Sequence, residues 1–373
     1  MKIAYLHNIE IEIDARTQKE INSLISNGHS VLFCGWNKEK RDVNEKKKII
    51  VREKEILIEN ICEKVRKSKG LKENIVPLIR YEFKLLIWLV KHQKEYEAIH
   101  GCSLDILILA YPIAKMFRKK IVYDIYDDYA DSHVVGKKLY SIIKKVDKYL
   151  IEHVDTLIIC SEKRMEQIAS NKAKKIVVIH NTPDIKEIGN DYIELEKNNR
   201  MKVVYVGNLH EGRYTYELAE IISQNPLWEF HCGGSGALEQ KIKMLANTYN
   251  NIFFYGKLPY EKTLALEKEC DVITALYDPN FPNHKYAAPN KFYEALYLGK
   301  PTVMAHETGM DEYVDKYRLG ITTEFSKEGI EYALNKISED LQVWRGRSED
   351  IRSMYFNYFS WEIMEERLLE IYR

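Results

Sequence analysis

The strongest constraint on the fold is a regular alternation of short apolar, β-rich segments with helical segments. In the first half, helices are expected at residues 18–26 and 140–154, and strands at KIAYLH, SVLFCGW, DILILA, KIVYDIY, TLIIC and KIVVIH (residues 2–7, 30–36, 105–110, 120–126, 156–160 and 175–180). Strands that alternate with helices in this way predict βαβ units on a parallel sheet. The first half is therefore expected to be a doubly wound α/β domain.

The second half repeats the scheme. Its expected helices and strands are residues 216–223, 238–249, 260–269 and 290–298, and residues 201–207, 228–234, 251–256, 271–277 and 301–305. A polar stretch, 182–199, separates the halves and is taken as the linker. We predict domains at residues 1–185 and 200–357, with a final helix within 358–373 that packs back on the first domain. Ser360 is its expected N-cap.

Length and composition agree with two globular domains, because 373 residues exceed a typical single core. Apolar residues are 45% and charged residues 30%, which argues against disordered and fibrous classes. The six cysteines are scattered singly and indicate a reducing cytosol. The start, MKIAYLH, is expected to be a strand and not a secretion signal. The apolar run 85–90 is far short of the roughly 20 residues that span a bilayer. A cytoplasmic protein is predicted.

Charge is distributed unevenly along the chain. Residues 1–180 hold 34 Lys and Arg against 25 Asp and Glu, whereas the remainder holds 22 against 31. The basic stretch 38–84, followed by an apolar run that contains Trp88, suggests a surface that rests on the anionic inner face of a membrane. Solvated helix faces and an internal helix are the alternative. Nucleic acid is disfavoured, because the lysines lack regularly interleaved aromatics.

Candidate binding residues lie in strand-to-helix turns, because ligands of doubly wound sheets bind beyond the carboxyl ends of the strands. In VVYVGNLHEGR, Gly207 and Asn208 end a strand, and Arg213 is near enough to donate to a phosphate. In HCGGSG, glycines including Gly233 precede a helix, like a phosphate-cradling loop without the Rossmann spacing. A plain tight turn is an equally good interpretation of both segments.

The most specific turn begins a helix with Pro289-Asn290-Lys291 and places Glu294 one turn later. Free amides and the helix dipole attract anions there, and Lys291 adds a charge that can offset a diphosphate. A carboxylate such as Glu294 can accept hydrogen bonds from two ribose hydroxyls. A fourth turn, AHETGMDEYV, offers backbone amides near Thr308 and Gly309 to a phosphate or to sugar hydroxyls.

In this order, the four turns resemble the donor-binding domain of retaining GT-B glycosyltransferases, group 1 or family 4-like, of surface-polysaccharide and glycolipid synthesis. The resemblance extends over nearly the whole chain and implies two Rossmann-like domains that face a central cleft. It implies that Gly207 approaches the donor phosphates, that Arg213 binds the diphosphate and that Glu294 binds ribose. The implied nucleobase clamp and remaining pyrophosphate contacts are Lys257, Leu258, Asn290, Lys291, Thr308 and Gly309.

The first half fits the same resemblance. The loop and helix at Asp14-Ala15-Arg16 resemble the acceptor-side segment after the first strand, and IVYDIYDDYADSH resembles the segment with the catalytic or acceptor-side residues, here Asp127, Asp128 or His133. The chain departs from the family in two places. Tyr286 stands where many relatives carry a glutamate near the transferred sugar, and IleGluIleAsp replaces a glycine pair in the first turn.

The resemblance implies transfer of a sugar from a nucleotide diphosphate sugar, with UDP as the expected nucleotide, to a saccharide or lipid-linked acceptor with retention of configuration. It implies no cofactor and no required metal, and the sequence contains no clustered His and Cys set that would suggest one. Two alternatives stay open. One is a sugar-nucleotide epimerase of the same architecture, and the other is a nucleotide-sugar-binding subunit that has lost catalysis.

Overall fold

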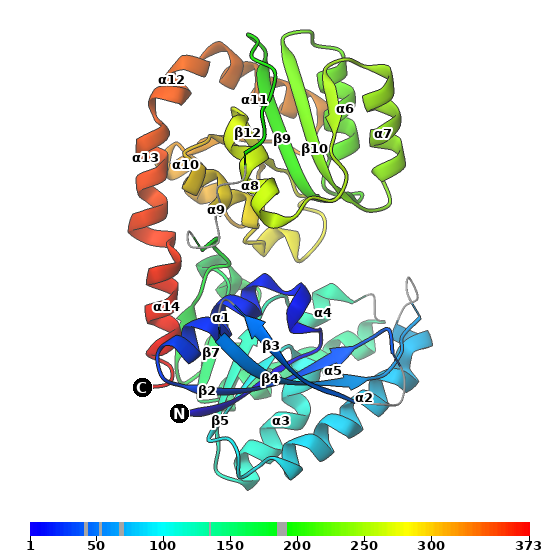
Figure 1. Cartoon of the computed structure of the whole chain (residues 1–373), viewed down its shortest axis with the longest axis vertical. Coiled ribbons are helices and arrows are strands. Elements are labelled where there is room, and N and C mark those ends of the chain that lie inside the picture. Colours follow the sequence, from blue (N-terminus) through cyan, green and yellow to red (C-terminus); the bar gives the residue numbers. More distant parts are fainter. Residues whose placement is uncertain (41–43, 52–53, 67–70, 134–135, 185–191) are drawn as a thin grey trace. The chain divides into compact units, whose positions relative to one another are not determined.

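A computed structural model describes residues 1–40, 44–51, 54–66, 71–133, 136–184 and 192–373. These residues form two compact units (Figure 1). One comprises Met1–Ile179 together with Met364–Arg373, and the other comprises His180–Ile363. The sequence places the join between residues 185 and 200, whereas the compact units divide between Ile179 and His180.

The first unit is built on an eight-stranded sheet in the order β3-β4-β2-β1-β5-β6-β7-β8. Neighbouring strands are parallel except β3 and β4, which pair antiparallel at one edge. The strands are β1 (Lys2–His7), β2 (Ser30–Asn37), β3 (Glu45–Val51), β4 (Lys54–Cys62), β5 (Ala98–Cys102), β6 (Lys120–Ile125), β7 (Thr156–Ile159) and β8 (Ile176–Val178).

Helices cover both faces of this sheet. Figure 1 shows α1 on the opposite side of the strands from α2 and α3. A large apolar core forms where α2, α3 and α5 pack against the strands, and it includes Leu85, Trp88 and Ile151. The helices and helical turns of this unit are η1 (Ile11–Ile13), α1 (Ala15–Ser26), α2 (Leu71–Lys91), α3 (Leu104–Met116), α4 (Tyr129–Ser132), α5 (Lys137–His153), η2 (Glu162–Glu166) and α14 (Trp361–Leu369), the last of which starts in the second unit.

The strand expected at residues 105–110 is wrong, because these residues form the middle of α3. An apolar run of this length is compatible with a strand or with a buried helix, and periodicity does not separate the two. The helix is buried at Leu104, Ile106 and Leu107, so it shows little amphipathic pattern. The strand in this part of the chain is β5, which directly precedes α3 and whose residues AIHGC are all buried.

The second unit contains a six-stranded, wholly parallel sheet in the order β11-β10-β9-β12-β13-β14. Its strands are β9 (Met201–Asn208), β10 (Trp228–Ser235), β11 (Ile252–Phe254), β12 (Val272–Ala275), β13 (Thr302–Ala305) and β14 (Gly320–Thr323). Both units therefore have the α/β, doubly wound architecture that the alternation predicts.

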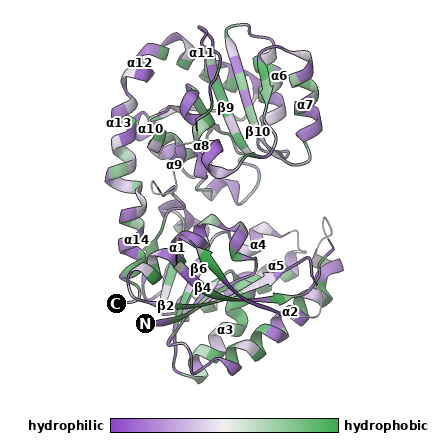
Figure 2. Cartoon of the chain, in the orientation of Figure 1, coloured by the Kyte–Doolittle hydropathy of each residue, from purple (hydrophilic) through white to green (hydrophobic). Residues whose placement is uncertain are grey.

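Apolar cores lie on both faces of the second sheet, and the strand β9 contributes alternately to two of them. Val203 and Tyr205 belong to the core under α6, α7 and α11, whereas Val204 and Val206 belong to the core under α8 and α9. Burial on both faces explains the nearly continuous apolar run of this strand, and Figure 2 shows apolar colour along it. The helices and helical turns are α6 (Thr215–Ser223), α7 (Glu239–Thr248), α8 (Tyr260–Glu269), η4 (His284–Tyr286), α9 (Asn290–Leu298), α10 (Asp311–Tyr317), α11 (Lys327–Glu339), α12 (Leu341–Gly346), α13 (Ser348–Met354) and η5 (Tyr355–Phe359).

The last residues of the chain pack against the first sheet. The guanidinium of Arg367 donates to the carbonyl of Val178 at 2.9 Å, and the Tyr372 hydroxyl lies 2.6 Å from Nδ1 of His100. Met364 and Leu368 are fully buried. Within the described residues, no helix combines the length and the apolar character needed to cross a membrane.

Candidate functional site

The carboxyl ends of β9 and β10 are held together by glycines. Gly207 pairs with Gly234 in the parallel register. A Cβ on Gly234 would lie 1.8 Å from the carbonyl oxygen of Gly207, and the backbone of Gly234 has a φ of +134°. A Cβ on Gly236 would likewise lie 2.4 Å from the Leu209 carbonyl oxygen. Gly234 and Gly236 are therefore needed where the ends of β9 and β10 approach each other closely. This agrees with the interpretation of the segment as a tight turn.

The turn after β11 joins the same strand ends. Gly234 donates its amide to the carbonyl of Gly256 at 2.7 Å. The side chain of Leu258 lies against Gly233, where a Cβ would be 3.3 Å away, and Lys257 is exposed. The structure thus brings the predicted nucleobase segment beside Gly233.

Arg213 follows β9 and has an unused hydrogen-bond donor. Its guanidinium carbon lies 3.5 Å from the centre of the Tyr277 ring, which holds the group in place by a cation–π contact. One terminal nitrogen of Arg213 is buried and has no hydrogen-bond partner among the described residues. A buried donor without a partner is costly, so this nitrogen is suited to an anionic ligand.

The start of α9 is built as the sequence predicts, with Pro289 as N-cap and Asn290 as first residue. The side-chain oxygen of Asn290 accepts a hydrogen bond from Asn181 at 2.8 Å. Lys291 does not extend freely from the helix, because its ammonium lies 2.6 Å from Glu294 and 2.7 Å from Glu267 of α8.

These three charged side chains form a buried cluster. The exposed fractions are 12% for Lys291, 1% for Glu294 and zero for Glu267. Burial lowers the pKa of Lys291, but the two carboxylates outweigh it and raise the pKa well above its usual value. Burial is also the main reason why the pKa of Glu267 rises to about 8. The sequence predicts that the positive charge of Lys291 offsets a diphosphate. In the structure, the two glutamates largely compensate this charge.

The fourth turn lies against the segment that leads into α9. Glu307 has a φ of +58°, unusual for a residue with a side chain, and its amide donates to Asp311 at 2.7 Å. A Cβ on Gly309 would lie 2.3 Å from the carbonyl oxygen of Ala287. The Thr308 hydroxyl is buried and donates to the Ala305 carbonyl at 2.5 Å. Thr308 and Gly309 are thereby brought close to the start of α9.

Two residues of this region were not selected from the sequence, namely Glu267 and Tyr277. Glu267 lies on α8, a segment that the sequence predicts only to be a helix. Its partner Lys291 is far from it in the sequence. Tyr277 follows β12 and carries no charge. The position of Tyr277 just after a strand is the one signal that sequence reasoning could have used.

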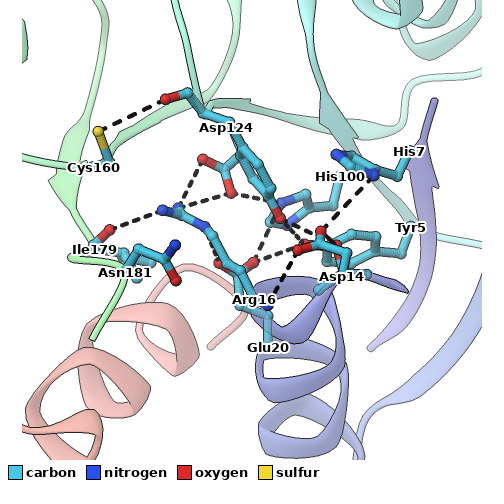
Figure 3. Close-up of polar contacts among 12 residues, drawn as sticks. Tyr5, His7, Asp14, Arg16, Glu20, His100, Asp124, Cys160, Ile179 and Asn181 are labelled. Carbon is cyan, nitrogen blue, oxygen red and sulfur yellow. Dashed lines mark hydrogen bonds and ion pairs between the residues drawn. The ribbon is translucent and has the colours of Figure 1, made fainter. Parts of the chain in front are cut away.

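In the first unit, Arg16 is the centre of a buried polar network (Figure 3). Its guanidinium binds both oxygens of Asp124 at 3.0 and 3.1 Å, Glu20 at 2.9 Å and the Ile179 carbonyl at 3.2 Å. Tyr5 donates to Glu20 at 2.8 Å. Burial, reinforced by Asp124, raises the pKa of Glu20. Arg16 thus holds α1 to the ends of the strands, and a role toward an acceptor stays a prediction.

Asp14 occupies the N-cap of α1. Its carboxylate accepts hydrogen bonds from the Arg16 amide at 3.2 Å and from the Thr17 hydroxyl, and it lies 3.9 Å from Nδ1 of His7. Burial lowers the pKa of His7 to about 4, although Asp14 opposes this shift. His7 is therefore neutral at physiological pH.

The predicted catalytic segment contains side chains with different surroundings. Asp128 is buried, accepts from two amides as the N-cap of α4, and lies 2.6 Å from the Lys144 ammonium. Asp127 has a side chain that is 66% exposed and lies 3.2 Å from Arg164. Nδ1 of His133 lies 2.8 Å from the Tyr129 carbonyl. Asp127 is thus the more accessible of the two carboxylates.

One cluster in the described residues has a spacing compatible with a metal ion. His100, Cys102 and Asp124 offer ligand atoms within 4.8 Å of one another, and all are buried. Asp124 is already bound on both oxygens by Arg16, and burial raises the pKa of the Cys102 thiol well above its usual value. This donor set does not suit a cation, because thiols bind metals as thiolates.

The known proteins that resemble the chain in sequence include glycosyltransferases. No family model matches the chain. The O-antigen biosynthesis glycosyltransferase WbnH of Escherichia coli is 26% identical over 214 residues, which cover 56% of this chain and 58% of WbnH. The chain therefore matches somewhat over half the length of this relative. The uncharacterised glycosyltransferase MJ1069 of Methanocaldococcus jannaschii is 25% identical over 68% of this chain and 69% of its own length.

Solved structures resemble the chain over its whole length. Sucrose-phosphate synthase of Thermosynechococcus elongatus superposes with a TM-score of 0.76 at 16% identity, covering 100% of this chain and 98% of its own. The Anabaena protein Alr3699/HepE, solved in complex with UDP, gives 0.69 at 17% identity and 99% coverage of both chains. The lipopolysaccharide outer core galactosyltransferase WaaB gives 0.65 at 14% identity, covering 100% of this chain and 99% of its own. The chain therefore has the GT-B fold and resembles, in sequence, glycosyltransferases of O-antigen synthesis.

Proposed function

We propose that the protein is a glycosyltransferase that transfers a sugar from a nucleotide diphosphate sugar, with UDP as the nucleotide, to a saccharide or lipid-linked acceptor. The observation that carries the proposal is the buried, unpartnered nitrogen of Arg213, in a second unit that also places a buried carboxylate, Glu294, one turn into α9. A diphosphate would satisfy the guanidinium, and ribose hydroxyls would satisfy the carboxylate. The O-antigen relatives and the UDP complex of HepE support this class of donor.

The proposed division of roles follows from these surroundings. Gly207, Asn208 and the amides near Thr308 and Gly309 line the phosphates, and Gly233, Lys257 and Leu258 border the nucleobase. Arg213 offsets the charge that develops on the leaving diphosphate. Asn290 and Lys291 fix the start of α9. Retention at the anomeric carbon is part of the proposal and rests on the family resemblance, as does the expectation that no metal is required.

On the acceptor side we propose Asp14, Arg16, Asp127, Asp128 and His133 as the residues to test. Among them Asp127 has the most accessible carboxylate. The buried positions of Arg16 and Asp128 favour a supporting role, in which they hold the loops that contact the acceptor.

The donor assignment is tested with two variants and a control. A thermal-shift screen first selects the nucleotide sugar that stabilises the wild type. Arg213→Ala and Glu294→Gln are then expected to raise the donor KM by roughly 10- to 100-fold, as expected for a lost hydrogen bond to a charged group. Arg213→Ala should also lower kcat, because it removes charge stabilisation of the leaving diphosphate. Arg345→Ala serves as the control, because its guanidinium is occupied by Asp271 at 2.8 Å. Wild-type KM values in both site variants would refute the assignment.

The same screen separates the two alternatives. An epimerase converts the donor to an isomer without any acceptor, whereas a binding subunit is stabilised by the donor and never consumes it. Transfer to an added saccharide or lipid-linked acceptor, with the anomeric configuration of the product assigned by NMR, supports the proposed reaction. Conversion in the absence of an acceptor would instead favour the epimerase.

We further propose that the protein works at the cytoplasmic face of a membrane, through an apolar and basic surface of the first unit. The helix α2 exposes an apolar stripe at i, i+4 spacing, and α5 exposes apolar side chains beside lysines. The exposed residues are Ile75, Val76, Ile79, Phe83, Ile87 and Val90 on α2, and Leu139, Tyr140, Ile142 and Tyr149 with Lys137, Lys138, Lys145 and Lys148 on α5. Apolar side chains next to cations complement an anionic bilayer surface.

This surface differs from the one expected from the sequence. Trp88 belongs to the apolar run from which the sequence predicts a membrane surface, but it is only 5% exposed, and its indole nitrogen donates to Glu59 at 2.6 Å. Residues facing the opposite side of α2, such as Phe83 at 62% exposure, take its place.

Flotation with vesicles tests the membrane proposal. The wild type is expected to float with vesicles rich in phosphatidylglycerol and not with pure phosphatidylcholine, and added salt should weaken binding. The double variant Ile79→Glu/Phe83→Glu should remain at the bottom of the gradient. Met244→Glu, at an exposed position of α7, is the matched control and should float. Equal flotation of the wild type and the double variant would exclude this surface.

A further inference from the structure

Glu267 is a fully buried carboxyl group next to the residues proposed to bind the donor. It lies on α8, and its Oε1 is 2.7 Å from the Lys291 ammonium. The same ammonium lies 2.6 Å from Oε2 of Glu294 on α9. Lys291 thus connects the carboxylate that is proposed to bind ribose with one that is sealed in the interior. Glu294 is 1% exposed and Glu267 is fully buried.

The cluster is not balanced in charge if both glutamates are ionised. One ammonium would face two carboxylates in a region that excludes water, and an uncompensated buried charge is strongly unfavourable. Neither carboxyl oxygen of Glu267 has a well-aligned hydrogen bond among the described residues, although Oε1 lies 2.7 Å from the Lys291 ammonium. Burial raises the pKa of this carboxyl to about 8, with Lys291 lowering and Glu294 raising it. A neutral Glu267 whose Oε1 contacts the Lys291 ammonium, beside a Lys291 to Glu294 ion pair, is consistent with these observations.

We propose that Glu267 is a positioning residue for the nucleotide: it anchors the Lys291 ammonium, and Lys291 in turn fixes the carboxylate of Glu294 toward the ribose hydroxyls. The inference rests on the proposed donor site. A lysine has three donors and a flexible stem, so two acceptors on different helices restrict it more than one does. Without Glu267, the ammonium pairs with Glu294 alone and competes with the ribose for its oxygens.

Two substitutions of Glu267 separate the positioning role from packing alone, because one removes the hydrogen-bond acceptor and the other keeps it. Glu267→Leu fills the space but offers no acceptor, and we expect it to raise the donor KM about tenfold with kcat within about twofold of the wild type. The ribose contact is made equally in the ground state and the transition state, so its loss appears in KM. Glu267→Gln keeps the acceptor for Lys291 and should restore the donor KM to within about twofold.

A double-mutant cycle tests whether Glu267 acts through Lys291. Lys291→Met alone should raise the donor KM, and adding Glu267→Leu should raise it no further, because the connecting ammonium is already absent. Glu229→Gln is the matched control. Glu229 is also a buried carboxyl of the second unit, but its cationic neighbours are Arg200 at 3.5 Å and Lys202 at 3.6 Å. This control should leave the donor KM unchanged, whatever it does to stability.

The outcomes distinguish the inference from the proposed function. If the wild type neither binds nor turns over any nucleotide sugar, the proposed function fails. If the wild type does, but Glu267→Leu has the wild-type donor KM, or its effect adds fully to that of Lys291→Met, the positioning role of Glu267 is refuted while the donor site stands. A rise in KM for Glu267→Leu that Glu267→Gln reverses supports it.

Discussion

Asp128 shows how neighbouring groups decide what a carboxylate can do. Its position after β6 makes it a catalytic candidate, because residues in such turns face ligands. The same position is the N-cap of α4, where its Oδ1 accepts from Ala130 and Asp131 at 3.1 and 3.2 Å. Its Oδ2 lies 2.6 Å from Lys144. These contacts account for its burial without any ligand.

Substitutions of Asp128 should therefore act on stability first. Asp128→Ala removes the cap and the ion pair and should lower the free energy of unfolding by roughly 1–3 kcal/mol in urea titrations. Asp128→Asn keeps an acceptor for the cap and should cost less, with kcat close to that of the wild type. A more than tenfold loss of kcat in a stable Asp128→Asn protein would assign it a part in the chemistry.

Asp147 on α5 should make stability depend on pH. It is 3% exposed and accepts from the Tyr123 hydroxyl at 2.9 Å. Burial raises its pKa to about 7. The folded chain thus holds this proton more tightly than the unfolded chain, so the free energy of unfolding falls as pH rises from about 4 to about 7 and levels off above.

Asp147→Asn removes this titration and keeps an acceptor for Tyr123. Urea unfolding at pH 5 and pH 8 measures the effect as a difference from the wild type, which cancels other titrating groups. From pH 5 to pH 8, the free energy of unfolding of the variant should rise by roughly 2–4 kcal/mol relative to that of the wild type. An equal difference at both pH values would mean that the carboxyl is ionised throughout.

Local spacing explains which site residues the sequence reveals. Lys291 and Glu294 are three apart on one helix, so their contact follows from helix geometry alone. Glu267 approaches from another helix, and only the packing of α8 against α9 brings it to Lys291. A partner defined by tertiary packing leaves no periodic signal in a single sequence.

At the scale of elements, the sequence predicts most of the strands that are buried on both faces, although it misses the buried strand β5. All five strands expected in the second half are present. The exceptions have physical causes. The apolar run within α3 imitates a strand, whereas β3, with the sequence EKKKIIV, is an exposed edge strand without an apolar pattern. Edge strands commonly carry lysines, which oppose further pairing.

The contact between β9 and β10 depends on one glycine. Gly234→Ala would place a Cβ 1.8 Å from the Gly207 carbonyl oxygen at a φ of +134°. The substitution should lower the free energy of unfolding of the second unit by roughly 3 kcal/mol or more, since both a clash and backbone strain result. Gly346→Ala is the matched control, because a Cβ there meets open space. It should be neutral or stabilising by roughly 0.5–1 kcal/mol. Equal stability of the two variants would contradict the close approach.

At the scale of the whole molecule, each unit has its own sheet and its own apolar cores. Chains with two such units commonly unfold in more than one step, and a ligand stabilises the step that it is linked to. All residues proposed to hold the nucleotide belong to the second unit, His180–Ile363. Nucleotide binding should therefore raise the midpoint temperature of one unfolding transition and leave that of the other unchanged.

Scanning calorimetry with and without UDP tests the central claim most directly. We expect UDP to raise the midpoint of one transition in the wild type, the same transition that Gly234→Ala lowers, and to have little effect on Glu294→Gln, which lacks the carboxylate for the ribose. If UDP and UDP-sugars leave both wild-type transitions unchanged, or if Glu294→Gln responds as strongly as the wild type, the second unit does not hold a nucleotide in the proposed way.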